Sequence, residues 1–202
     1  MPGNLFIVSA PSGAGKTTLV NALIQRLGSA FGLERVITYT SRDPRPGDLH
    51  GVDYHFMSSK EFEAKMAGGF FMEWSGAYGN YYGSPKSIVS DLDQGRSFIM
   101  ILDRAGAQAV QRVVPSATLI WIVPPSLYIL RQRLEARGAD SSESIERRLK
   151  LASHELEDER NNPRYAHHIL NENLPEAVEK LEQIVAAALS REGGVKQPET
   201  TI

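Results

Sequence analysis

Short apolar runs alternate along the chain with longer segments in which apolar residues recur every three or four positions. The runs are rich in β-forming residues, so they predict strands buried on both faces of a sheet. The longer segments predict helices that cover the sheet, and the strand–helix order predicts that its strands are parallel. We expect strands at 5–10, 97–102, 117–123 and 168–170, and helices at 19–27 with Gly28 as its end, 105–113, 126–137 and 175–189.

The stretch 35–83 has a different pattern, with many turn residues and aromatics between short β-rich runs. Ser58 followed by Glu61 is a capping-box signature that predicts the start of a short helix. We therefore predict an inserted subdomain with strands at 36–40, 54–57 and 70–74.

A strongly charged segment, 141–160, keeps Ile145, Leu149 and Leu156 on one face, which predicts a helix over a polar part of the molecule. The residues after Arg191 have the character of a loose tail.

Composition narrows the class of protein. The 202-residue chain is 42% hydrophobic and 23% charged, the proportions of a globular protein. It has no cysteine, which excludes a disulfide scaffold, a Cys-ligated zinc site and a cysteine nucleophile. The net charge of −2 argues against a broad cationic surface for nucleic acid, so any phosphate site must be local.

The N-terminal segment lacks the basic and apolar regions of a secretory signal, and no apolar run approaches membrane-spanning length. We therefore expect a cytoplasmic protein with no membrane or nucleic-acid partner. The oligomeric state stays open, a homo-oligomer included.

The strongest chemical signal lies between the first expected strand and the first expected helix, the context that a P-loop requires. Glycines there let backbone N–H groups converge on phosphate oxygens, and the helix N-terminus adds partial positive charge. Lys16 can reach the outer phosphates, and the Thr17 hydroxyl can bind Mg²⁺. Ala10 replaces the first glycine of the pattern, which requires an extended backbone there. A Gly-rich turn with an incidental lysine is the alternative. The predicted ATP-binding segment is Ala10, Pro11, Ser12, Gly13, Ala14, Gly15, Lys16, Thr17 and Thr18.

A second phosphate site is indicated by Arg42 and Arg45, three positions apart on a proline-containing turn that Tyr54 follows. Two guanidiniums and a phenol can converge on one phosphate dianion. A solvated basic turn is an equally good interpretation of these residues alone.

Glu73 lies inside the apolar run 71–74, and the aromatic segment 79–84, which follows, is interpreted as a tight turn. A carboxylate among apolar side chains is costly unless it is paired. Guanine offers a partner, since its N1–H and amino group are adjacent donors. The alternative is that Glu73 points to solvent, because strand side chains alternate.

Taken together, the motifs resemble the guanylate kinase family over residues 5–189. The second cluster is more specific than the P-loop, because other nucleotide kinases lack it. The matching motifs after the P-loop are Ser41-Arg42-x-Pro44-Arg45-x-Gly47-Asp48, Gly51-x-Asp53-Tyr54, Glu73-Trp74, Gly79-Asn80-Tyr81-Tyr82-Gly83-Ser84 and Arg133-Leu134-x-x-Arg137-Gly138.

The resemblance implies an α/β fold in one domain over 1–202, with a P-loop NTPase-type parallel sheet and covering helices, an inserted mixed α/β subdomain that binds GMP, and a helical lid. The implied boundaries are a core at about 1–34, 85–136 and 165–190, a GMP-binding subdomain at about 35–84, a lid at about 137–164 and a tail at about 191–202.

It also implies a reaction of purine nucleotide metabolism, the Mg²⁺-dependent transfer of the γ-phosphoryl group of ATP to GMP. The residues that it places at GMP are Thr38, Arg42, Arg45, Tyr54, Glu73, Tyr82, Ser84 and Asp103. The catalytic residues that it implies are Lys16, Arg42, Arg133, Arg137 and Arg148, with Asn171 at ATP and Thr17 at the metal.

One motif departs from the family pattern Asp-x-Asp-x-Gln-Gly. Here the first Asp, which supports Mg²⁺, is Ile101, and the Gln is Ala105. Asp103 emerges about 6–7 Å further along the strand, so it does not simply replace the missing group. We hypothesise that Mg²⁺ is held mainly by Thr17, the triphosphate and water. The alternative is that this branch of the family never used that carboxylate, and the rate of the enzyme stays open.

Two other functions remain open. A non-catalytic guanylate-kinase-like binding module characteristically loses the P-loop lysine and the lid arginines, whereas this chain keeps Lys16, Arg133, Arg137 and Arg148. A P-loop kinase for another small phosphorylated acceptor is opposed by the residues that the resemblance places at guanine.

Overall fold

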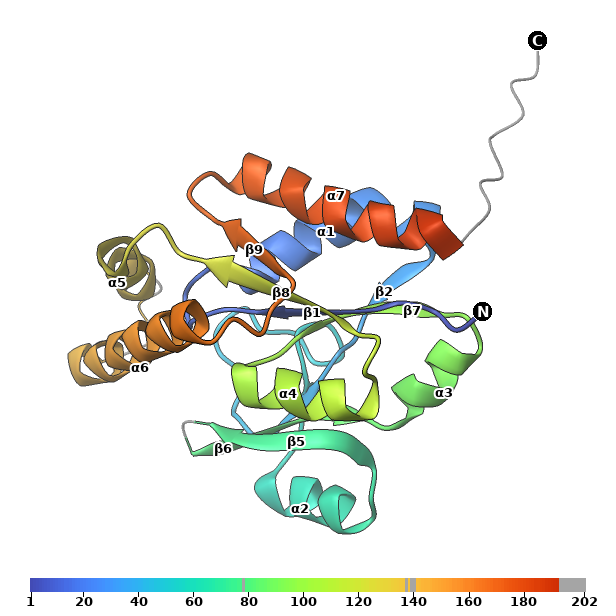
Figure 1. Cartoon of the computed structure of the whole chain (residues 1–202). Coiled ribbons are helices and arrows are strands. Elements are labelled where there is room, and N and C mark those ends of the chain that lie inside the picture. Colours follow the sequence, from blue (N-terminus) through green and yellow to red (C-terminus); the bar gives the residue numbers. More distant parts are fainter. Residues whose placement is uncertain (78, 137, 139–140, 193–202) are drawn as a thin grey trace.

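The computed structural model describes residues 1–77, 79–136, 138 and 141–192. The predicted lid residue Arg137 and the tail from 193 onward lie outside the described residues. A parallel sheet with strand order β2-β7-β1-β8-β9 forms the core (Figure 1), which confirms the predicted fold class. Its strands, in that order, are Leu33–Arg35, Ser97–Ile101, Leu5–Ser9, Thr118–Val123 and His167–Leu170.

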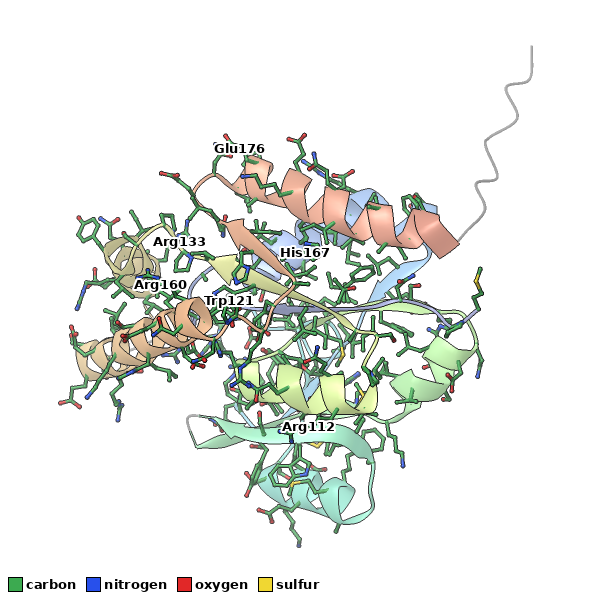
Figure 2. All side chains as sticks on the ribbon, in the orientation of Figure 1. Arg112, Trp121, Arg133, Arg160, His167 and Glu176 are labelled. Atoms are coloured by element: carbon green, nitrogen blue, oxygen red, sulfur yellow. The ribbon has the colours of Figure 1, made fainter. Side chains whose placement is uncertain are left out.

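Helices cover both faces of this sheet. The long helices α1 and α7 lie together on one face, and α3 and α4 lie on the other (Figure 1). Trp121 of β8, labelled in Figure 2, is 1% exposed and packs against Tyr165, with a ring-centroid distance of 5.0 Å. The helices are α1 Lys16–Phe31, α3 Ser87–Asp93, α4 Arg104–Val113, α5 Leu127–Ala136, α6 Ser142–Asn161 and α7 Leu174–Glu192.

A second, four-stranded sheet lies below α4, in the order β4-β3-β6-β5 (Figure 1). Its helix α2, Ser59–Ala67, starts with the predicted capping box: the Ser58 hydroxyl accepts from the Glu61 N–H, and the Glu61 carboxylate accepts from the Ser58 N–H. Phe62 of α2 is fully buried against this sheet. The strands are β3 Tyr39–Thr40, β4 His55–Phe56, β5 Phe71–Ala77 and β6 Asn80–Pro85.

Several local expectations were wrong. Helix α1 does not end at Gly28 but runs to Phe31, because Gly32 takes the left-handed conformation (φ 62°) and donates to the Gly28 carbonyl. Segment 79–84 is not a tight turn: most of it forms β6, whose backbone pairs with β5 and β3. Only the last two residues of the strand expected at 36–40 form a strand, β3, because β2 already ends at Arg35 and β3 starts at Tyr39.

Helix α3 was not predicted, because its short span buries only Ile88 and Leu92 and so leaves little helical periodicity. None of the described helices is long and apolar enough to cross a membrane.

Candidate active site

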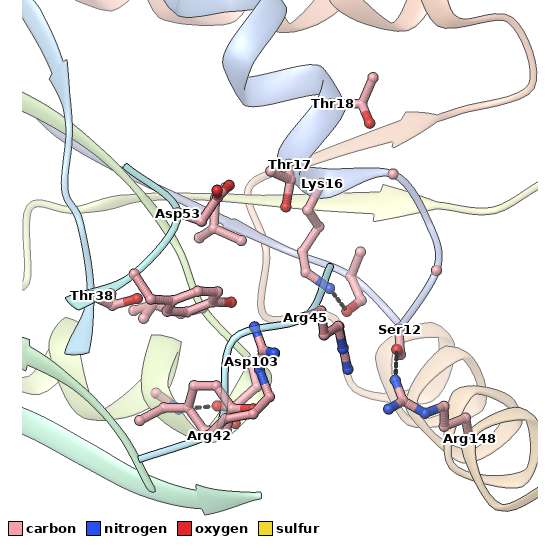
Figure 3. A pocket seen from close by; sticks show the side chains of 18 of the residues that line it. Ser12, Lys16, Thr17, Thr18, Thr38, Arg42, Arg45, Asp53, Asp103 and Arg148 are labelled. Atoms are coloured by element: carbon pink, nitrogen blue, oxygen red, sulfur yellow. Dashed lines mark hydrogen bonds between the residues drawn. The ribbon is translucent and has the colours of Figure 1, made fainter. Parts of the chain in front are cut away.

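A cleft of about 1060 Å³ lies at the carboxyl ends of β1 and β7, bounded by the P-loop, the second sheet and α6. Ligands of parallel α/β sheets commonly bind at this edge. The cleft brings together the described residues that sequence analysis placed at ATP and at GMP, except Pro11, Ala14 and Ser84, which are not on its wall. Figure 3 shows the P-loop on one side of the cleft and the arginines of the second sheet on the other.

The P-loop joins β1 to α1 through two glycines with left-handed backbone, Gly13 (φ 86°) and Gly15 (φ 93°). Lys16 is the first residue of α1, and its ammonium donates to the carbonyl of Ala10 at 2.6 Å. The first N–H groups of a helix have no partner within the helix, and they carry the positive end of its dipole. The loop therefore gathers N–H donors and an ammonium group in the way that phosphate oxygens require.

Side chains from distant elements hold this loop. Asn171, which follows β9 and is 4% exposed, donates from Nδ2 to the Ala14 carbonyl at 2.8 Å. Arg133 of α5 donates in turn to the Asn171 carbonyl at 3.0 Å. A Cβ atom at Gly15 would lie only 2.5 Å from Asn171 Nδ2, so glycine is needed here for space as well as for backbone conformation. Asn171 thus supports the P-loop directly.

Arg148 comes to the P-loop from α6. It is 8% exposed and donates from Nη1 to the Ser12 hydroxyl at 2.7 Å, as Figure 3 shows. Arg133 Nη1 is buried, and within the described part of the chain it has no hydrogen-bond partner. Both guanidiniums line the cleft beside the phosphate loop.

On the opposite wall, Arg42 and Arg45 are organised by Asp48, a residue to which no role was assigned from the sequence. One Asp48 oxygen accepts from Arg42 Nη2 at 2.7 Å and from the Arg45 backbone N–H at 2.9 Å. Burial alone would raise the pKa of Asp48, but these two hydrogen bonds hold it below its usual value. The Arg42 guanidinium lies 5.5 Å from the centre of the Tyr54 ring, which is 6.0 Å from that of Tyr82. The phosphate-binding residues predicted here are therefore one packed group.

Beyond the arginines, a carboxylate from the second sheet and one from the start of α4 come together. Glu73 of β5 is 6% exposed and accepts from the Ser84 hydroxyl at 2.6 Å. Burial raises the pKa of Glu73 to about 7; the charge of Asp103 adds to the shift, and the Ser84 bond opposes it. Asp103 accepts from the Gly106 N–H at 2.7 Å, capping α4, and from the Ser75 hydroxyl at 3.3 Å. Glu73 is therefore not the solvent-facing residue of the alternative interpretation.

Thr38 lines the same part of the cleft and is 8% exposed. Gly106 allows α4 to approach the two carboxylates: a Cβ atom there would lie 3.2 Å from an Asp103 oxygen and 3.3 Å from a Glu73 oxygen. This end of the cleft is thus narrow and rich in acceptors.

A metal would find few protein ligands. Thr17 lines the cleft next to Lys16 at the start of α1 (Figure 3). At the end of β7 the chain presents the aliphatic Ile101, which packs against the core, and Asp103 already holds the Gly106 N–H. Among the described residues there is no group of three or more His, Cys, Asp or Glu suited to a metal. A Thr hydroxyl fits Mg²⁺ bound mainly by phosphates and water, because this ion usually keeps several waters.

Several other charged residues on the cleft wall were not predicted to have a function, among them Arg35 and Glu155. Arg35, at the end of β2, donates to Asn21 Oδ1 at 2.9 Å and to the Asp53 carbonyl at 3.3 Å. Glu155 of α6 lies half-buried on the cleft wall. No motif marks either residue, and only the position of Glu155 two helical turns after Arg148 could have drawn attention to it.

Comparisons with known proteins agree with this geometry. The family model described as guanylate kinase matches residues 2–188. A guanylate kinase from Dechloromonas aromatica is 42% identical over 189 residues, which cover 93% of this chain and 91% of that protein. One from Symbiobacterium thermophilum is 40% identical, with 94% and 87% covered.

One solved structure gives the same assignment, and a second shares only the fold. The crystal structure of guanylate kinase from Anaplasma phagocytophilum has a TM-score of 0.75 and 26% identity, covering 93% of this chain and 87% of that one. A gluconokinase from Sinorhizobium meliloti, with 17% identity and a TM-score of 0.50, shares the fold alone. The resemblance drawn from the motifs is confirmed, and the chain belongs to the guanylate kinase family.

Proposed function

We propose that this protein transfers the γ-phosphoryl group of ATP to GMP, which gives ADP and GDP. The observation that carries the proposal is the pairing, in one cleft, of a P-loop with a second cationic group that is separate from it. Phosphoryl transfer needs alignment of donor and acceptor and neutralisation of spreading negative charge, rather than a covalent nucleophile. Two opposed phosphate sites supply the alignment.

On the donor side, the P-loop N–H groups, Lys16, Arg133 and Arg148 would bind the triphosphate. The buried Nη1 of Arg133 offers a donor that a phosphate oxygen can accept from. Mg²⁺, bound through Thr17 and the phosphates, would neutralise charge on the transferring group. Arg148 reaches the P-loop from α6, and closure of α6 over the bound nucleotide would exclude water and so disfavour hydrolysis of ATP.

On the acceptor side, Arg42, Arg45, Tyr54 and Tyr82 would bind the GMP phosphate. The Asp48 carboxylate orients the Arg42 guanidinium and fixes the backbone of Arg45, so Arg42 meets the phosphate already oriented. Glu73 and Asp103 offer acceptors to the adjacent N1–H and amino group of guanine, and adenine lacks this pair of donors. Ser84 orients Glu73 through its hydroxyl, although Ser84 itself is not on the cleft wall.

The test is ADP formation from ATP with a panel of nucleoside monophosphates, in a coupled assay. We expect turnover with GMP, weak turnover with AMP, and loss of turnover in Lys16→Met. Saturable GMP binding without ADP formation would instead favour a binding module, and turnover with a different acceptor alone would contradict the guanine assignment. A cytoplasmic location, the oligomeric state and the subdomain boundaries stay predictions.

A further inference from the structure

Helix α6 approaches the P-loop at two places on the same face. Arg148 contacts the Ser12 hydroxyl, and Glu155 follows about two turns further along the helix. Both side chains line the cleft, as do Lys16, Thr17 and Ile101. Glu155 therefore lies on the cleft wall, where the charges of both Lys16 and Asp103 act on its carboxylate.

The Glu155 carboxylate has no assigned task in this cleft. Among the described residues, no hydrogen bond or ion pair engages it. Burial raises the pKa of Glu155, and the charge of Asp103 adds to the shift, while the charges of Lys16 and Arg104 oppose it. A half-buried carboxylate on the cleft wall, on which the charge of Lys16 acts, can accept a hydrogen bond from a donor that enters the cleft.

Arg104 fixes the position of Glu155. This arginine starts α4, immediately after Asp103, and it donates from Nη1 to the Glu155 backbone carbonyl at 3.0 Å. It also forms ion pairs with Asp158 at 2.6 Å and with Glu159 at 3.2 Å. The turn of α6 that carries Glu155 is thus tied to the segment that ends β7, where Ile101 lies.

We infer that Glu155 is a positioning residue for the metal–nucleotide complex: it accepts a hydrogen bond from a water molecule bound to Mg²⁺. The end of β7 cannot do this, because position 101 carries an aliphatic side chain. Carboxylates that hold metal-bound groups in this way strongly affect metal affinity without being ligands themselves. The inference rests on the proposed binding of Mg²⁺ and ATP, but not on the identity of the acceptor.

The first experiment measures metal affinity rather than turnover. Mn²⁺ binding to the complex of protein with a non-hydrolysable ATP analogue is followed by electron paramagnetic resonance for wild type, Glu155→Gln and Glu157→Gln. We expect Glu155→Gln to weaken Mn²⁺ affinity about tenfold. Glu157→Gln, an exposed residue of the same helix that is not on the cleft wall, should leave it unchanged. Thermal melting verifies that each variant is folded.

A second experiment tests whether position 101 and Glu155 share one task. The double variant Glu155→Gln/Ile101→Asp should regain the Mn²⁺ affinity that Glu155→Gln loses. Ile101→Asp should therefore raise Mn²⁺ affinity more in the Glu155→Gln variant than in the wild type. Analogue affinity measured without metal should stay the same or increase in Glu155→Gln, because a negative charge near the triphosphate is removed.

Unchanged Mn²⁺ affinity in Glu155→Gln overturns the inference. The inference is also overturned if Glu155→Gln weakens binding of the ATP analogue without metal but leaves Mn²⁺ affinity unchanged. That result would show that Glu155 acts only by positioning Lys16. Neither measurement needs GMP, so failure of the proposed reaction with GMP is recognised separately, in the assay of turnover.

Discussion

Raising the pH from 6 to 8 should tighten GMP binding, because the carboxyl group assigned to guanine changes its charge in this range. Burial raises the pKa of Glu73 to about 7. Only the ionised carboxylate offers acceptors to both guanine donors. The ionised fraction rises from about one tenth at pH 6 to about nine tenths at pH 8, so the apparent Kd should fall roughly tenfold from this group alone.

Isothermal titration calorimetry with wild type and Glu73→Gln separates this effect from others. The phosphate of GMP has its own pKa near 6, which adds the same slope to both proteins. The variant places an amide donor opposite the guanine donors and should lose about 2–4 kcal/mol of the preference for GMP over AMP. If wild type and variant show equal pH slopes, or if the variant keeps its preference for GMP, Glu73 does not read guanine.

The same group gives a pH dependence of folding that needs no ligand. The pKa of Glu73 is 4.5 in the reference state and about 7 in the fold, so the folded protein binds this proton more tightly. Its stabilisation is complete below pH 4.5 and is lost as the pH rises through 7, a change of about 3 kcal/mol. Urea unfolding at pH 5 and pH 8 should show this loss in the wild type and little of it in Glu73→Gln. A wild type that gains stability relative to the variant would reverse the sign and refute the reasoning.

Three further changes test the rest of the cleft. Gly15→Ala places a methyl group against Asn171, so it should lower the free energy of unfolding by about 1–3 kcal/mol and abolish ATP binding. The control in thermal melting is Gly32→Ala, because Gly32 also has a positive φ but no neighbouring atom within 4 Å of an added methyl group. Arg35→Lys should raise the KM for GMP about tenfold and leave the KM for ATP unchanged, because Arg35 holds the Asp53 carbonyl beside Tyr54. The control is Arg26→Lys, a change at an exposed arginine. An equal rise in the KM for ATP would contradict the assignment of Arg35 to the GMP side. Ile101→Asp should lower the Mg²⁺ concentration for half-maximal rate, whereas Ile101→Asn should not; equal curves would show that this position does not face the metal.

The donor side of the cleft could be predicted from the sequence because its information is local. Strand, loop and helix follow one another without interruption, so glycine spacing and the position of Lys16 define the phosphate cradle directly. The contacts that hold the cradle could not be found in this way. Asn171 and Arg148 reach it from elements more than a hundred residues away, and their partners depend on how those elements pack.

The acceptor side of the cleft could not be predicted from local sequence in this way. Glu73 lies on β5 whereas Asp103 caps α4, and the apolar run around Glu73 left open whether it faces the cleft or solvent. Family resemblance, rather than periodicity, assigned it to guanine. Asp48 belongs to a matching motif but was given no role, and Arg35 was missed because an arginine at a strand end carries no pattern of its own. The roles of both residues appear only with their partners.

Neutral acceptors take part in holding the cations of the donor side, and this bears on how phosphate binds. Lys16, Arg133 and Arg148 each donate at least one hydrogen bond to a neutral oxygen atom, a backbone carbonyl or a hydroxyl. A phosphate oxygen is a charged and therefore stronger acceptor, so replacing these hydrogen bonds with bonds to the nucleotide is favourable. Arg42 is instead bound to the Asp48 carboxylate, a partner that already neutralises it. A phosphate that displaced Asp48 from Arg42 would therefore gain little binding energy, whereas a phosphate that binds Arg42 beside Asp48 gains more. The Asp48 carboxylate then keeps the Arg42 guanidinium oriented while GMP binds and leaves.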